Sequence, residues 1–82
     1  MAEHTVITPL PGTFYRKATP DSANYVEVGD PVSADTVIGL IEVMKLFTSL
    51  RAGVAGIVRE VLVKDGELVE FDQPLFIIEP HG

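Results

Sequence analysis

The second half of the chain repeats much of the first half, and this repeat sets the strongest limit on the possible folds. When residues 26–42 are moved by 37 positions onto residues 63–79, six of the 17 pairs are identical, among them Gly29 with Gly66. A repeated unit of this size buries its apolar face against its neighbour. We therefore expect two similar halves that pack on each other as a pseudo-two-fold sandwich.

The two halves differ by one insertion. Gly12 and its neighbours match Gly56 and its neighbours at a shift of 44 positions, seven more than the shift of the later segments. The first half therefore holds seven extra residues between Tyr15 and Val26. Because the second half lacks them, strand pairing does not require them.

Short runs rich in Val, Ile and Phe alternate with turn-forming Gly, Pro and Asp along the whole chain. The main runs are at residues 6–7, 14–15, 26–28, 37–41, 57–58, 61–63 and 75–78. Runs of this length and spacing favour β-strands, and none is long enough to predict a helix. We predict one all-β domain over residues 1–82, with a core at about 5–79 and about four strands in each half.

Size and charge narrow the function classes. The chain has 82 residues, no cysteine and a formal net charge of −6. A domain of this size buries only about 60% of its unfolded surface, which leaves little interior for a deep catalytic pocket. The acidic charge argues against a nucleic acid or an anionic membrane as partner. Without cysteine there is no disulfide and no thiolate ligand.

Other sequence signals of catalysis, metal binding and secretion are missing as well. His4 and His81 lie near the ends, and the chain has no His-x-x-x-His, Gly-x-Ser-x-Gly or phosphate-loop pattern. The start lacks the pattern of a secretion signal, and no apolar run reaches the ~20 residues that span a bilayer. We expect no catalytic residue, no metal ligand, no membrane contact and a cytoplasmic location.

The halves join at a short apolar turn that holds a single charge. Lys45 is the only charged residue between Val43 and Leu50, and Met44 and Leu46 flank it. Asn-Gly or Asp-Gly is the usual choice at a hairpin tip, so apolar flanks indicate a recognition surface around the lysine. The alternative is that both flanks fold into the core and Lys45 is an ordinary solvated lysine.

The stretch Glu42-Val43-Met44-Lys45-Leu46 resembles the biotin-attachment motif, usually Glu-Ala-Met-Lys-Met, of the biotin carboxyl carrier proteins. The resemblance extends from about Pro9 to Glu79 and is strongest to the carriers of bacterial acetyl-CoA carboxylases. It includes residues 12–16, 20–21, 26–29 and 69–75. Val43 and Leu46 depart from the usual Ala and Met but keep the surface apolar. Val43 adds β-branched bulk beside the lysine, and because it lies next to the turn we expect it to make few core contacts.

This resemblance implies a flattened β-barrel or sandwich of two four-stranded antiparallel sheets, acting as a carrier without catalysis of its own. It implies that a biotin protein ligase joins biotin to Lys45 and recognises Glu42, Val43, Met44 and Leu46. Biotin carboxylase then carboxylates the biotin, and carboxyltransferase passes the carboxyl group from carboxybiotin to acetyl-CoA, forming malonyl-CoA. Biotin on Lys45 is therefore the implied cofactor.

In the resembling carriers the insertion is a protruding thumb that contacts the biotin ring. The thumb corresponds here to residues 18–25, with Lys17 at its base. The candidate residues are Lys17, Ala18, Thr19, Pro20 and Asp21, of which Pro20 and Asp21 suit a turn tip. A small hydroxyl residue commonly stands at the place of Lys17, whose ammonium is instead a candidate to attract the charge of carboxybiotin. The alternative is a passive surface loop.

Two other functions remain open. The lipoyl domains share the implied fold and also carry a modified hairpin lysine, although their usual flanks are Asp before the lysine and Ala after it. A biotin carrier for a different carboxylase is the other alternative within the class of carrier domains. A barrel that is never modified and acts only as an interaction module belongs to another class. The mass of the chain after co-expression with each ligase distinguishes a biotin carrier, a lipoyl carrier and an unmodified module.

Overall fold

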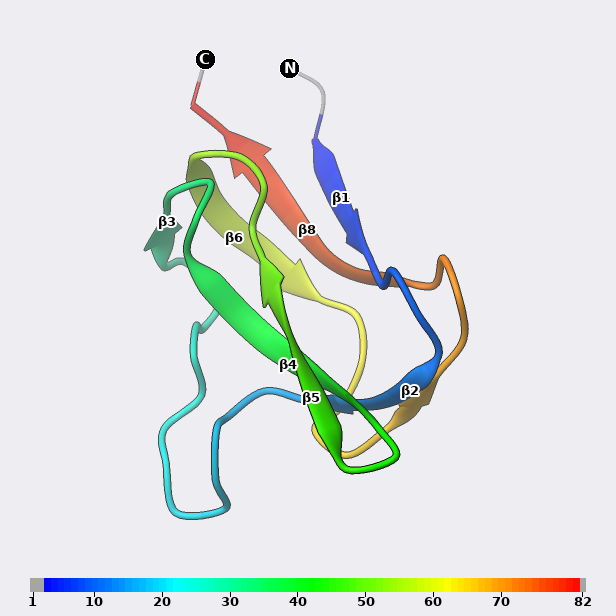
Figure 1. Ribbon diagram of the computed structural model, residues 1–82. Helices are drawn as coiled ribbons and strands as arrows, with labels where there is room; N and C mark the ends of the chain where they lie inside the picture. Colours follow the sequence, from blue (N-terminus) through cyan, green and yellow to red (C-terminus); the bar gives the residue numbers. More distant parts are fainter. Residues whose placement is uncertain (1–2, 82) are drawn as a thin grey trace.

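Eight β-strands make up the fold of the computed structural model, which describes residues 3–81 (Figure 1). They are β1 (His4–Ile7), β2 (Gly12–Tyr15), β3 (Pro31–Val32), β4 (Val37–Val43), β5 (Leu46–Arg51), β6 (Gly56–Val61), β7 (Leu68–Val69) and β8 (Pro74–Pro80). The described part of the chain contains no helix, so none is present there that would be long and apolar enough to cross a membrane. The all-β prediction is confirmed; its outermost positions, 1–2 and 82, lie outside the described residues.

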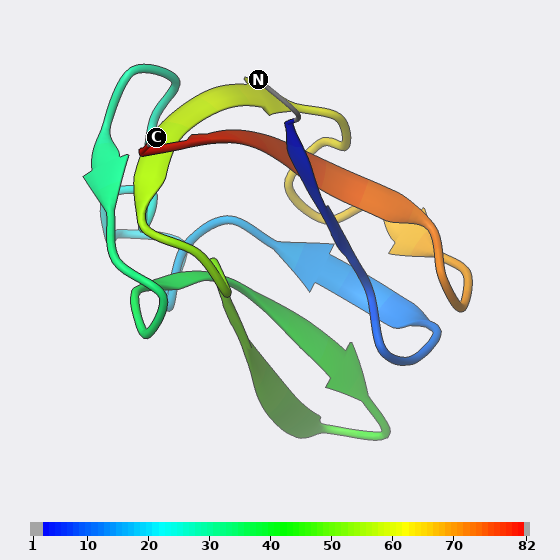
Figure 2. The same ribbon diagram turned by 90° about the horizontal axis from the view of Figure 1, so that it is seen from above.

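The strands form two four-stranded antiparallel sheets that face each other as two layers (Figure 2). One sheet has the order β1-β8-β6-β3, and the other has the order β5-β4-β2-β7. Each strand has an equivalent in the other half of the sequence: β1 corresponds to β5, β2 to β6, β3 to β7 and β4 to β8. Replacing every strand by its equivalent converts one strand order into the other. The predicted pseudo-two-fold sandwich is therefore confirmed.

The repeat also extends to the hydrogen bonds of the turns. The amide of Glu27 donates to Asp30 Oδ2 at 2.9 Å, and 37 positions later the amide of Lys64 donates to Glu67 Oε1 at 2.9 Å. Between the bonded residues, Gly29 and Gly66 have φ angles of 98° and 83°. Glycine reaches this left-handed region without steric cost, so each half uses the same turn for the same geometric reason.

The core lies between the two layers and draws on both halves of the sequence. Phe14 of β2 and Phe76 of β8 are fully buried and meet edge to face, with ring centroids 5.7 Å apart. The other large apolar side chains that are fully buried are Ile38, Ile41, Val58, Leu75 and Ile78. Because Phe14 and Phe76 come from different sheets, their contact ties the two layers together.

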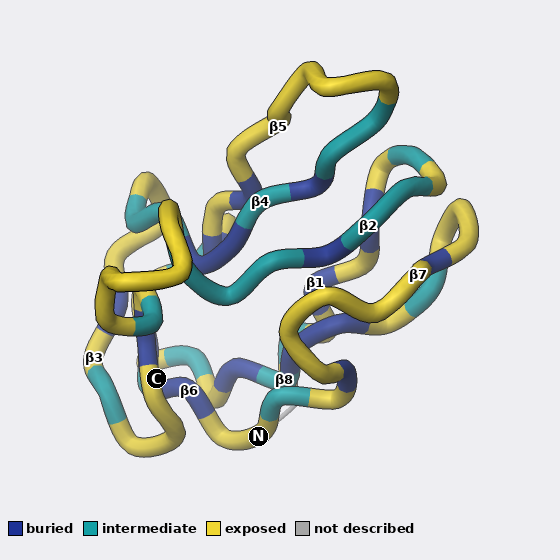
Figure 3. Tube along the Cα trace, turned by 90° about the horizontal axis from the view of Figure 1, so that it is seen from below, coloured by how far each residue is buried: buried dark blue, intermediate teal, exposed yellow. Residues whose placement is uncertain are grey.

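The β4–β5 hairpin and the thumb project from the end of the molecule opposite the chain termini (Figure 1). In the hairpin, the tip and most of β5 are exposed, whereas the middle of β4 is buried (Figure 3). The sandwich thus presents two projecting segments at one end.

Candidate functional site

The β4–β5 hairpin closes through a two-residue turn. Val43 of β4 pairs with Leu46 of β5, which leaves Met44 and Lys45 as the central residues. Their φ angles are 51° and 67°. Positive φ at both central residues is the type I′ pattern, which normally carries Asn-Gly because other side chains are strained there. Lys45 therefore lies at the tip of the hairpin, as the sequence predicts. The backbone conformation of this turn is unfavourable for both of its central residues, Met44 and Lys45.

The apolar residues beside Lys45 point into solvent. Met44 is 89% exposed, Leu46 is 75% exposed and Phe47 is 56% exposed. The alternative in which Met44 and Leu46 fold back into the core is therefore wrong. We call Met44, Leu46 and Phe47 the hairpin surface. It surrounds a lysine that is itself exposed.

Val43 is placed differently from the expectation. It is half-buried and packs against the core, although its place beside the turn suggested few core contacts. The reason is register: Val43 is the last residue of β4 and lies over Gly12 of β2. A Cβ atom on Gly12 would lie 2.9 Å from Val43 Cγ2 and 2.5 Å from the Glu42 carbonyl oxygen. The close approach of these strands therefore requires glycine at position 12.

Glu42 is tied to the neighbouring strand. Its Oε1 accepts a hydrogen bond of 3.2 Å from the hydroxyl of Tyr15. Desolvation of the phenol, followed by this hydrogen bond and the negative charges of Glu42 and Asp65, raises the pKa of Tyr15 above its ordinary value. Glu42 thus holds a side chain of β2 in place beside the hairpin.

The thumb forms a closed loop with its turn at Pro20-Asp21. At its base the amide of Tyr25 donates to the carbonyl oxygen of Arg16 at 2.7 Å. At its tip the amide of Ser22 donates to the carbonyl oxygen of Thr19 at 3.0 Å, and the two hydroxyls are 2.7 Å apart. The predicted turn tip is confirmed.

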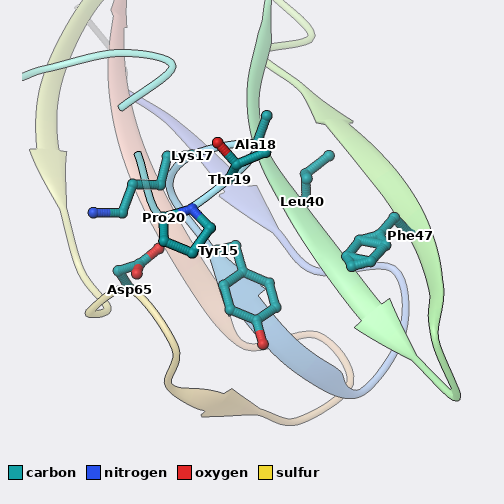
Figure 4. A pocket seen from close by; sticks show the side chains of 8 residues that line it. All are labelled: Tyr15, Lys17, Ala18, Thr19, Pro20, Leu40, Phe47 and Asp65. Carbon is teal, nitrogen blue, oxygen red and sulfur yellow. The ribbon is translucent and has the colours of Figure 1, made fainter. Parts of the chain in front are cut away.

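A pocket of about 380 Å³ separates the thumb from the hairpin (Figure 4). Its lining consists of Tyr15, Lys17, Ala18, Thr19, Pro20, Leu40, Phe47 and Asp65. Leu40 and Phe47 form one side, and Lys17 and Asp65 lie on the opposite side (Figure 4). The Tyr15 and Phe47 rings are 6.2 Å apart at their centroids. The pocket therefore has an apolar wall beside the hairpin and a charged wall at the thumb.

The pocket brings together four of the five candidate thumb residues, all except Asp21. Sequence reasoning missed the other four lining residues, Tyr15, Leu40, Phe47 and Asp65, as part of the site. Leu40 pairs with both Tyr15 and Ser49, so it lies on the outer face of its sheet, in the row of the Tyr15 side chain. The sequence signal for this wall was available: side chains alternate between the two faces of a strand, so apolar Leu40 next to core-facing Ile41 points outward.

Comparison with known families decides where the chain belongs. The family model described as "Biotin-requiring enzyme" in the biotin/lipoyl group matches residues 4–78. The chain belongs to this biotin/lipoyl family. The family relationship agrees with the resemblance at residues 42–46 and with the duplicated all-β fold.

Similar members of the biotin/lipoyl family carry a common name. The chain is 47% identical over 75 residues to the biotin carboxyl carrier protein of acetyl-CoA carboxylase from Pseudomonas aeruginosa, covering 92% of this chain and 48% of that protein. It is 40% identical over 79 residues to the protein of the same name from Haemophilus influenzae, covering 96% and 51%. The chain thus spans about half the length of these relatives.

Two solved carboxylase structures contain a similar fold. Urea carboxylase from Kluyveromyces lactis matches with a TM-score of 0.80 and 25% identity, over 96% of this chain and 6% of that chain. A single-chain long-chain acyl-CoA carboxylase matches with a TM-score of 0.81 and 24% identity, over 98% and 7%. The second likeness is one of fold alone.

Proposed function

We propose that this chain is a biotin carboxyl carrier domain of an acetyl-CoA carboxylase and that Lys45 carries biotin in an amide bond. The observation that carries the proposal is the strained hairpin tip, where Lys45 stands between two highly exposed apolar side chains. Family membership and the names of the relatives support it. The proposed domain covers residues 1–82, with its core at about 5–79.

The surroundings of the other two lysines favour Lys45 as the attachment site. Lys17 is half-buried and lines the pocket. Lys64 is exposed, but its neighbours are the buried Val63 and the charged Asp65. A ligase that recognises apolar side chains around an exposed amine therefore finds them at Lys45.

The four motif residues divide into two roles in this proposal. Met44 and Leu46 are exposed and available to contact the ligase directly. Glu42 and Val43 are half-buried and act through the hairpin, because Glu42 holds Tyr15 and Val43 packs against the core. Ligase recognition thus combines an exposed apolar pair with a hairpin of fixed geometry.

The pocket beside the hairpin fits a small ring with polar edges. Phe47, two residues from Lys45, provides part of its apolar wall, while Lys17 offers donors and Asp65 offers an acceptor on the other side. Biotin supplies the ureido ring that accepts and releases a carboxyl group. The chain itself presents the arm and offers it a resting surface, and it carries out no bond-breaking step.

The proposed partners are a biotin protein ligase, a biotin carboxylase and a carboxyltransferase that uses acetyl-CoA, all in the cytoplasm. A tethered arm replaces diffusion of a free cofactor by a high effective concentration at each active site. The exposed hairpin at the end away from the termini suits this task, because an arm attached at its tip can extend away from the sandwich to a partner.

A second candidate is a biotin carrier domain for a different carboxylase. The likeness to urea carboxylase favours it, because that enzyme's name states a different acceptor from acetyl-CoA. Assays of the assembled enzyme with acetyl-CoA, other acyl-CoA esters and urea decide between the two. Carboxylation of acetyl-CoA well above the others supports the first proposal.

Intact mass after co-expression tests the attachment itself. With a biotin protein ligase, we expect one biotinyl adduct on the wild-type chain and on Lys64→Arg, and none on Lys45→Arg, which keeps the charge but lacks the acylable amine. An adduct on Lys45→Arg would show that the site is wrong. A lipoyl adduct formed by a lipoyl ligase, with no biotinyl adduct, would make the domain a lipoyl carrier, and no adduct with either ligase would leave an interaction module.

A further inference from the structure

We propose that Arg16 and Asp65 form a clamp that fixes the thumb over the pocket, and that Arg16 is the positioning residue of this part of the site. What the thumb contacts rests on the proposed function, whereas the clamp itself rests on hydrogen bonds of the described chain. Nothing in the attachment motif at residues 42–46 requires this clamp.

Arg16 uses both its main chain and its side chain to hold the thumb. Its amide donates to Asp65 Oδ1 at 2.7 Å, and its carbonyl oxygen accepts from the amide of Tyr25 at 2.7 Å. Its Nη2 donates to the carbonyl oxygen of Val26 at 3.0 Å and to Glu27 Oε1 at 3.3 Å. Arg16, which precedes the thumb, is therefore bonded to three residues at or just after the end of the thumb and to Asp65 in the turn before β7.

The guanidinium group is well placed for this role. The Arg16 side chain is only 21% exposed, so its bonds are less weakened by water than those of a surface arginine. Glu27 extends the network, because its Oε2 accepts from Asn24 Nδ2 at 3.0 Å. The carboxylate of Glu27 thus joins the arginine to a residue within the thumb.

The repeat shows that the clamp is specific to the half with the thumb. Both halves share two backbone hydrogen bonds between strand and turn. The amides of Gly29 and Gly66 donate to the carbonyl oxygens of Val58 and Phe14, and the amides of Val58 and Phe14 donate to those of Asp30 and Glu67. The residue equivalent to Arg16 in the second half is Glu60, an exposed residue of β6. A carboxylate has no N–H group to donate to a carbonyl oxygen, so the fold itself does not depend on an arginine here.

The position of the clamp connects it to the pocket. Arg16 directly precedes Lys17, and Asp65, which accepts from the Arg16 amide, is itself part of the pocket lining. Loss of these bonds frees residues 17–20, which form the thumb side of the pocket (Figure 4). The apolar wall at Leu40 and Phe47 belongs to the β4–β5 hairpin and stays in place.

Amide hydrogen exchange on the full chain tests the clamp. In Arg16→Ala we expect exchange of the Tyr25 amide to rise about tenfold or more, because the loop closed by the side chain opens locally. Arg51→Ala is the matched control: Arg51 Nη1 donates to the Asp35 carbonyl oxygen at 2.7 Å, away from the thumb. It should leave exchange in residues 17–25 unchanged.

A pair of substitutions at Asp65 separates positioning from general destabilisation. Asp65→Asn keeps an oxygen that accepts from the Arg16 amide, whereas Asp65→Ala does not. We expect exchange of the Arg16 amide to rise severalfold in Asp65→Ala and to stay near the wild-type rate in Asp65→Asn. If the two variants behave alike, or if Arg16→Ala and Arg51→Ala have equal effects on the thumb, the clamp does not exist.

The functional consequence is measured separately on the biotinylated domain. Arg16→Ala should be biotinylated at the wild-type rate and should turn over more slowly with biotin carboxylase, with Arg16→Lys recovering part of the loss. Unchanged turnover with a freed thumb would overturn the positioning role. Absence of biotin on the wild-type chain would instead refute the proposed function, while the exchange data would still decide whether the clamp exists.

Discussion

Met44→Asn should make the domain more stable and a poorer ligase substrate. Met44 and Lys45 have φ angles of 51° and 67°, a region that costs residues other than glycine about 1–2 kcal/mol each. Asparagine tolerates this region several-fold better than methionine does. Because Met44 is 89% exposed, replacing it sacrifices little burial. We expect a gain of about 0.5–1 kcal/mol, or roughly 2–8 °C in Tm for a domain of this size.

Thermal unfolding of the unmodified chain, followed by circular dichroism, measures the gain. Met44→Leu is the control, since leucine keeps an apolar flank but has no preference for the left-handed region. We expect no rise in Tm for Met44→Leu and a biotinylation rate that stays closer to wild type than that of Met44→Asn. If Met44→Asn melts at or below the wild-type temperature, the argument that function maintains a strained turn is wrong.

Three further predictions concern the hairpin base, the pocket and the thumb. Val43→Ala should lower Tm by about 4–8 °C, because burial of the two methyl groups that it removes contributes about 1 kcal/mol to stability. It should also raise the biotinylation rate if β-branched bulk slows the ligase. An unchanged Tm in melting curves would contradict the packing argument. The pKa of Tyr15 is higher in the folded state than in the unfolded chain, so the stability of the domain should fall as the pH rises above about 10. Thermal melts at a series of pH values should show a smaller loss of stability in Tyr15→Phe. Replacing Lys17–Tyr25 by a short glycine-containing turn should leave a folded, biotinylated domain with slower carboxyl transfer, whereas unfolding would make the thumb structural and unchanged turnover would make it a passive loop.

The internal repeat was sufficient to predict a pseudo-two-fold sandwich of two similar halves. Matching Gly29 with Gly66 and Gly12 with Gly56 places the turns and strands of both halves, and the structure bears this out in its exchangeable strand orders. The hairpin tip at Lys45 follows from the same reasoning, because the junction of two halves is a turn between strands. These features depend on local pattern and on chain order, which a sequence displays directly.

The pocket and the clamp depend on cross-strand register, which a sequence does not display. Asp65 meets the Arg16 amide although 49 positions separate them. The expectation for Val43 was wrong for the same reason. Val43 is the last residue of β4, and the alternation of side chains along this strand directs it toward the core although it lies next to the turn. Such contacts follow only once both sheets are assembled.

The central claim, that Lys45 carries a carboxyl group between two enzymes, is tested most directly by following label. With biotinylated wild-type chain, biotin carboxylase, ATP and isotopically labelled bicarbonate, we expect label to become attached to the chain and to pass to acetyl-CoA when carboxyltransferase is added. Lys45→Arg should acquire none, and Lys64→Arg should behave as wild type. Label on Lys45→Arg, or no label on a wild-type chain whose mass shows biotin, would contradict the account.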